Sequence, residues 1–109
     1  LTMDRTVLEK MLAQGNDNLL LRYTLGTLCL KEGMLEAAIE HLQQALSQDP
    51  KHSASWKNYG KALMQLERNQ DAISAYERGI CVAGEKGDVQ AVKEMEVFLK
   101  RLKKQHESG

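Results

Sequence analysis

The sequence predicts an all-α fold built as a stack of antiparallel helix hairpins, and two observations support this. Apolar residues recur at spacings of three and four along most of the chain, as on the buried face of an amphipathic helix. The pattern of Leu19 to Pro50 then returns 34 residues later, so that Gly26 is matched by Gly60. A helix pair that recurs at a fixed period is typical of solenoids, in which neighbouring pairs bury one another.

The composition favours one globular domain over residues 1–109. A single proline and 42% hydrophobic residues exclude collagen-like and strongly disordered classes. The 15 basic and 15 acidic side chains cancel, so nothing global points to nucleic acid or an anionic membrane. No run approaches the roughly 20 apolar residues of a membrane helix, and the N-terminal residues are unlike a secretory signal. We therefore expect a cytoplasmic protein.

The first half of the chain predicts three helices. Their apolar faces and ends place them at about residues 4–14, 18–32 and 35–48. Gly15 and Gly33 can end the first two in a left-handed conformation, and Asn18 can cap the second. Pro50 stops the third, because proline cannot continue a helix and disfavours helical geometry in the residue before it.

The second half predicts three more helices, at about 53–66, 69–86 and 88–105. Ser53 and Asn69 are the expected N-caps of the first two. Gly87 followed by Asp88 gives a stop and a start signal for the last helix. The lysines and arginine near its end suit a helix C-terminus better than a nucleic-acid patch, given the neutral net charge. Residues 106–109 are expected to be a frayed tail.

The 34-residue offset superimposes small residues on small and large on large, with Ala38 on Ala72 and Ile39 on Ile73. This layout resembles the tetratricopeptide repeat, whose signature is W-x2-L-G-x2-Y, then A-x3-F, then P. The first copy presents Arg22, Leu25, Gly26, Cys29, Ala38, Leu42, Ala45 and Pro50 at those places. The second presents Trp56, Tyr59, Gly60, Leu63, Ala72, Tyr76, Gly79 and Gly84. Arg22 in place of tryptophan, and Cys29 and Leu63 in place of tyrosine, depart from the signature.

The resemblance implies a right-handed α-solenoid with whole repeats at 19–52 and 53–86. A shift of 34 maps Leu42 onto Leu8, so the helix in 4–15 resembles the second half of a preceding repeat. A shift of 36 maps Trp56 onto Val92, so the helix at 88–105 resembles a capping helix. Two whole repeats and two half units meet the need of a solenoid for stacked neighbours and caps.

The resemblance also implies a non-enzymatic module that binds a peptide or helix of a partner protein in a concave groove. The candidate groove residues lie off the packing face of the first helix of each pair: Leu20, Tyr23, Thr27, Leu30, Lys57, Asn58, Lys61, Met64, Lys93 and Val97. Such a groove suits an acidic or C-terminal segment. The lysine and asparagine clamp of some relatives is absent, because only Asn58 matches it; Tyr23, Thr27, Gln90 and Glu94 stand at its other places.

Each candidate also has a structural interpretation. The lysines Lys57, Lys61 and Lys93 can simply be solvated, and Tyr23 can be a wedge between hairpins. A second hypothesis for the chain is self-association into a homodimer through Val89, Val97 or Phe98 of the last helix. A third is an accessory subunit of a larger complex.

No catalytic, metal-binding or cofactor-binding residues are predicted. The histidines lack the spacing of a metal site, and His41 is expected to face outward into solvent. Glu94 and Glu96 are two apart and point to different faces of a helix. Cys29 and Cys81 are expected to be small buried residues and not ligands.

Overall fold

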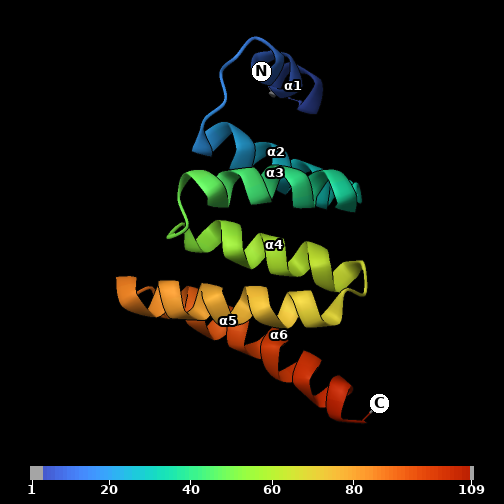
Figure 1. The fold of residues 1–109 in the computed structure, drawn as a ribbon, viewed down its shortest axis with the longest axis vertical. Coiled ribbons are helices and arrows are strands. Elements are labelled where there is room, and N and C mark those ends of the chain that lie inside the picture. The colour runs from blue at the N-terminus through green and yellow to red at the C-terminus, as the bar shows by residue number, and fades with distance from the viewer. Residues whose placement is uncertain (1–3, 109) are drawn as a thin grey trace.

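The computed structural model describes residues 4–108, without the side chains of His106 and Ser108. This part of the chain consists of six helices and contains no strand, which confirms the all-α prediction. The helices are α1 (Arg5–Ala13), α2 (Leu19–Lys31), α3 (Leu35–Gln48), α4 (Ser53–Gln65), α5 (Asn69–Lys86) and α6 (Val89–Ser108). They are layered along the longest axis, with the two ends of the chain at opposite ends of the stack (Figure 1).

The helices pack as two hairpins with one helix added at each end. The most extensive contacts join α2 with α3 and α4 with α5, while α3 contacts α4 and α5 contacts α6. α1 packs on α2. In addition, α2 contacts α4 and α4 contacts α6, so these three helices lie next to one another and form one face of the stack. This is the face that the sequence predicts to carry the groove.

Three glycines allow the closest helix contacts. A Cβ atom on Gly26 would lie 2.6 Å from Cγ of Leu42, and one on Gly60 would lie 2.7 Å from Cε1 of Tyr76. A Cβ atom on Gly79 would lie 2.5 Å from Sδ of Met95. In all three pairs, the bulky residue is 16 positions after the glycine. The close approach predicted at Gly26 and Gly60 is therefore present, and the same relationship joins α5 to α6.

Most predicted helix ends are confirmed, including the left-handed glycines Gly15, Gly33 and Gly87, with φ of 94°, 80° and 74°. Oδ1 of Asn18 accepts a hydrogen bond from the Leu21 amide at 2.9 Å and caps α2. Oδ1 of Asp88 accepts one from the Ala91 amide at 3.1 Å.

Two predicted caps are wrong. Ser53 and Asn69 are the first residues inside α4 and α5, and the N-cap positions fall to His52 and Arg68. Glu67, with a φ of 61°, completes the turn between α4 and α5. Arg68 can therefore be the N-cap, and α5 begins one residue earlier than a cap at Asn69 would allow. Glu67 stands 34 positions after Gly33 and has the same left-handed conformation.

Two further expectations differ from the structure. Helix α6 continues to Ser108 and not to about 105, so only Gly109 of the expected frayed tail lies outside the described residues. Cys29 is buried as predicted, but Cys81 is exposed because it lies on the outer side of α5, where its Sγ is 3.6 Å from Oε1 of Glu85. Among the described helices, none is long and apolar enough to cross a membrane.

Candidate functional site

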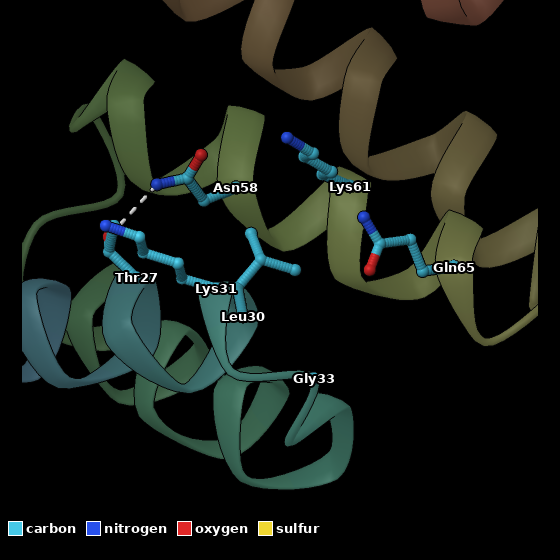
Figure 2. A pocket seen from close by; sticks show the side chains of 7 residues that line it. All are labelled: Thr27, Leu30, Lys31, Gly33, Asn58, Lys61 and Gln65. Carbon is cyan, nitrogen blue, oxygen red and sulfur yellow. Dashed lines mark hydrogen bonds between the residues drawn. The ribbon is translucent and has the colours of Figure 1, made fainter. Parts of the chain in front are cut away.

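A pocket with a volume of about 440 Å³ opens between α2 and α4 on the face shared by α2, α4 and α6. Figure 2 shows its walls: one comes from α2 and the turn that follows it, and the other from α4. The lining residues are Thr27, Leu30, Lys31, Gly33, Asn58, Lys61 and Gln65. Four of the predicted groove residues, Thr27, Leu30, Asn58 and Lys61, are thus brought together.

A hydrogen bond joins the two walls of this pocket. Nδ2 of Asn58 donates to Oγ1 of Thr27 at 3.1 Å, as the dashed line in Figure 2 marks. Both side chains are half-buried. An amide and a hydroxyl that are hydrogen-bonded across two helices restrict each other's rotamers. This contact therefore helps to fix the position of α2 relative to α4 at the pocket.

Lys57 forms an ion pair with another residue of the chain, so its charge is not free to meet a partner in the groove. Its Nζ donates to Oε2 of Glu94 on α6 at 2.8 Å, and Nε2 of Gln90 donates to the other oxygen of Glu94 at 3.0 Å. The hydrogen bond from Lys57 is the main reason that the pKa of the Glu94 carboxyl is lowered, with that from Gln90 next. The predicted role of Lys57 in meeting a partner's charge is therefore opposed by this ion pair.

The apolar and aromatic candidates differ in exposure. The Tyr23 ring meets the His52 ring edge-on, with centroids 5.0 Å apart, so it packs against the start of the second hairpin. Leu30 and Met64 are half-buried and pack against the core. Tyr23 thus has the contacts expected of a wedge between hairpins, whereas Leu30 also lines the pocket.

A second, smaller pocket of about 300 Å³ lies between α1 and α2. Its lining is largely apolar and comprises Leu8, Met11, Asn18, Leu20, Leu21 and Thr24. Leu20 is 73% exposed, the highest value among the exposed large hydrophobic residues of the described chain. The structure therefore places predicted residue Leu20 away from Thr27 and Lys61, in a pocket of its own.

The last two candidates, Lys93 and Val97, lie on α6 and line neither pocket. Both are exposed, Val97 by 55%. They are not brought together with the residues of α2 and α4.

Sequence reasoning missed Lys31 and Gln65, which line the larger pocket. Each follows a predicted residue, Thr27 or Lys61, by four positions, which is one helical turn on the same face. Extending the predicted stripe by one turn on α2 and α4 would have found both residues.

His41 does not face solvent freely, contrary to the prediction. It is half-buried, and its Nδ1 lies 3.1 Å from a guanidinium nitrogen of Arg22, which donates to it. Burial, with the nearby Arg22 charge, lowers the pKa of His41. Within the described residues, no three His, Cys, Asp or Glu side chains are grouped so that they could hold a metal ion.

Comparison with known proteins is decisive for the family. The family model described as Tetratricopeptide repeat matches residues 30–94. A TPR repeat-containing protein of Pseudomonas aeruginosa is 52% identical over 95 residues, which cover 87% of this chain and 90% of that protein. The chain belongs to the tetratricopeptide-repeat family.

Solved structures confirm the right-handed solenoid. A protein of Bordetella parapertussis, with a structure determined in solution, is 43% identical, with a TM-score of 0.83 over 96% of this chain and 91% of that one. The TPR2B domain of yeast Sti1, solved as a complex with pHsp70, has a TM-score of 0.84 over 93% of this chain and 81% of that one, at 12% identity. Tetratricopeptide-repeat proteins are generally interaction modules and not enzymes. The repeat boundaries expected at 19–52 and 53–86 stay a prediction.

Proposed function

We propose that this tetratricopeptide-repeat chain is an adaptor that binds a peptide or helix of a partner protein in the face formed by α2, α4 and α6. The single observation that carries the proposal is the pocket of about 440 Å³ between α2 and α4. Four residues predicted for the groove line it, and its walls are joined by the bond between Asn58 and Thr27. The pocket is lined mostly by polar side chains that converge around Leu30, and a preformed hollow with convergent polar groups can fix the orientation of a bound segment.

The yeast domain with the same fold supports this proposed binding function, since it was solved as a complex with pHsp70. The candidate residues that line the pocket, Thr27, Leu30, Asn58 and Lys61, are the ones we propose to contact the partner directly. We assign a supporting role to Lys57, Tyr23 and Met64, because each contacts other residues of the chain. The predicted location in the cytoplasm stays a prediction.

The test is capture of proteins from cells with the chain immobilised, comparing two tryptophan variants. Gln65→Trp fills the pocket with a bulky ring, whereas Gln44→Trp places the same ring on the exposed surface of α3. Both positions are exposed, so the fold is expected to persist, which a circular-dichroism melt checks. A direct partner in the groove is lost with Gln65→Trp and kept with Gln44→Trp. Equal capture by both variants would exclude the pocket as the binding site.

A second candidate function is self-association through α6. Val89 is 60% exposed and Val97 is 55% exposed, so the terminal helix carries apolar side chains that a second copy can cover. Sedimentation velocity over a wide range of concentration tests this, with Val89→Ser and Val97→Ser together as the variant. A wild-type chain that stays monomeric throughout removes the homodimer.

A further inference from the structure

Both pockets open onto one stripe of helix α2. Leu20, Thr24, Thr27 and Lys31 follow one another at spacings of four, three and four, which places them on a single helix face. Leu20 and Thr24 line the smaller pocket, while Thr27 and Lys31 line the larger one. With a helical rise of 1.5 Å per residue, Leu20 and Lys31 lie about 16 Å apart along the helix axis.

The two ends of this stripe differ in chemistry. The smaller pocket is lined by four large apolar side chains and by no charged residue. The larger pocket is lined by two lysines, Lys31 and Lys61, and by no carboxylate. The stripe therefore runs from an apolar end beside α1 to a cationic end between α2 and α4.

The two lysines of the larger pocket are free to meet an anion. Neither Lys31 nor Lys61 forms an ion pair or hydrogen bond with another described residue, and both are exposed. Lys57 differs, because Glu94 already neutralises it. In Figure 2, Lys31 extends back along α2 toward Thr27, and Lys61 lies on the opposite wall, on α4. Two unpaired cations on facing walls favour a carboxylate between them.

We propose that the groove selects an extended segment of a partner protein that carries a large apolar side chain and an acidic side chain about five residues apart. This inference rests on the groove function proposed above. The apolar side chain enters the pocket of Leu8, Met11, Leu20 and Leu21, and the carboxylate lies between Lys31 and Lys61. An extended chain advances about 3.3 Å per residue, so about five residues span the roughly 16 Å that separates Leu20 from Lys31 along the axis of α2.

Charge complementarity indicates that the polypeptide bound in the groove is acidic. The chain as a whole is neutral, so general attraction of anions is weak and the preference arises from these two lysines. The site also differs from a clamp centred on Asn58, because its cations come one turn later on each helix: Lys31 follows Thr27 by four positions, and Lys61 follows Asn58 by three.

The experiment is selection of a displayed random library of 12-residue peptides against the folded chain. The enriched peptides are expected to share an Asp or Glu and a Leu, Ile, Met or Phe at a spacing of four to six. The variant Lys31→Glu with Lys61→Glu is expected to select basic residues in place of acidic ones. The control variant Lys10→Glu with Lys86→Glu changes net charge equally, at exposed positions outside both pockets, and is expected to leave the selection unchanged.

Affinity measurements on one selected peptide then separate the two ends. Fluorescence anisotropy is expected to show a loss of about tenfold for Lys31→Glu with Lys61→Glu, or for Gln in place of the acidic residue of the peptide. These losses are expected to shrink in high salt, because salt screens exposed charges. Leu20→Ser is expected to weaken binding to a similar degree at every salt concentration.

The outcomes distinguish this inference from the function on which it rests. If Gln65→Trp abolishes peptide binding but the selected peptides show no acidic preference, or a spacing near 11 as in a helix, the bipartite recognition is wrong and the groove function stands. If Gln65→Trp leaves peptide binding intact, both proposals are wrong.

Discussion

Arg22 and Trp56 occupy equivalent positions 34 residues apart, and each binds the loop that precedes its own helix. The Arg22 guanidinium donates to both carboxylate oxygens of Asp17, at 2.9 and 3.0 Å. The Trp56 indole Nε1 donates to the carbonyl oxygen of Pro50 at 2.8 Å. The departure of Arg22 from the family signature thus exchanges an indole anchor for an ionic one and keeps the loop attached.

The loop anchor of the first hairpin is expected to be sensitive to salt. Arg22→Ala and Asp17→Ala each remove one partner of a two-bond contact, to which Gln48 adds a hydrogen bond from the end of α3. We expect both single variants and the double variant to lower the thermal midpoint at low salt, with the loss in the double variant smaller than the sum of the two single losses. All of these losses are expected to shrink at high salt, because salt screens the ion pair.

The matched control for this anchor is the ion pair of Arg68 with Asp71, whose side chains are 51% and 57% exposed. A double-mutant cycle there is expected to show almost no coupling, as is usual for exposed pairs. Equal coupling in the two cycles would contradict a special role for the contact of Arg22 with Asp17.

Gly60 and Gly84 are expected to respond to alanine in opposite directions. Gly60→Ala forces a methyl group against the Tyr76 ring and is expected to cost about 1–3 kcal/mol of unfolding free energy. Gly84 also lies within a helix, but a Cβ atom added there would meet no neighbouring side chain or helix within 4 Å. Gly84→Ala is expected to add about 0.5–1 kcal/mol through helix propensity. Urea unfolding of the two variants measures both changes, and a stabilising Gly60→Ala would refute the close contact.

Glu67 is expected to be a strained position. Its φ of 61° is left-handed, a region that costs an ordinary residue about 1–2 kcal/mol. Glu67→Gly is expected to stabilise the chain, and Gly33→Ala, at the matching turn with φ of 80°, to destabilise it. Chemical denaturation of both variants checks the pair. Destabilisation by Glu67→Gly would show that the side chain contributes more than the strain removes.

Stability is expected to fall as pH decreases from about 7.5 to 5.5. Burial lowers the pKa values of His41 and His52 in the folded chain. Below an unfolded pKa of about 6.5, the unfolded chain therefore binds more protons, which favours unfolding. The stabilisation is complete above that value and is lost as pH falls through the folded pKa values.

Thermal melts across this pH range measure the effect, with His41→Gln and His52→Gln combined as the comparison. Their slope of stability against pH is expected to flatten. An unchanged slope would mean that other groups carry the dependence.

Local signals predicted most of the fold, because they act between residues close in sequence. The glycine at 33 and the cap at Asn18 are decided within one helical turn. The predicted N-cap at Ser53 is wrong because a serine also fits the first turn of a helix. Only the observed path of the loop shows that the N-cap is His52 and that Ser53 is the first helical residue. Cys81 was misassigned since its residue type favours burial while its helix face does not.

The candidate site was less accessible to sequence reasoning. The resemblance to the repeat family indicates that the first helix of each pair lines the groove, and helical spacing then selects Thr27, Leu30, Asn58 and Lys61, which line the pocket. The ion pair that engages Lys57 joins positions 37 apart, so it depends on how α4 and α6 lie side by side. A side chain's partner on another helix cannot be read from the spacing on its own helix, which is why Lys57 was predicted as a free charge.

Each of the three glycines at close helix contacts is followed 16 residues later by the side chain that packs on it. This constant separation has a kinetic consequence. Gly26 with Leu42, Gly60 with Tyr76 and Gly79 with Met95 all join helices that are consecutive in the chain. Each contact closes only a short loop, so little chain entropy is lost before it forms. Chains dominated by such local contacts fold within about microseconds to milliseconds, and a stack of this kind can begin to order at any hairpin and grow outward.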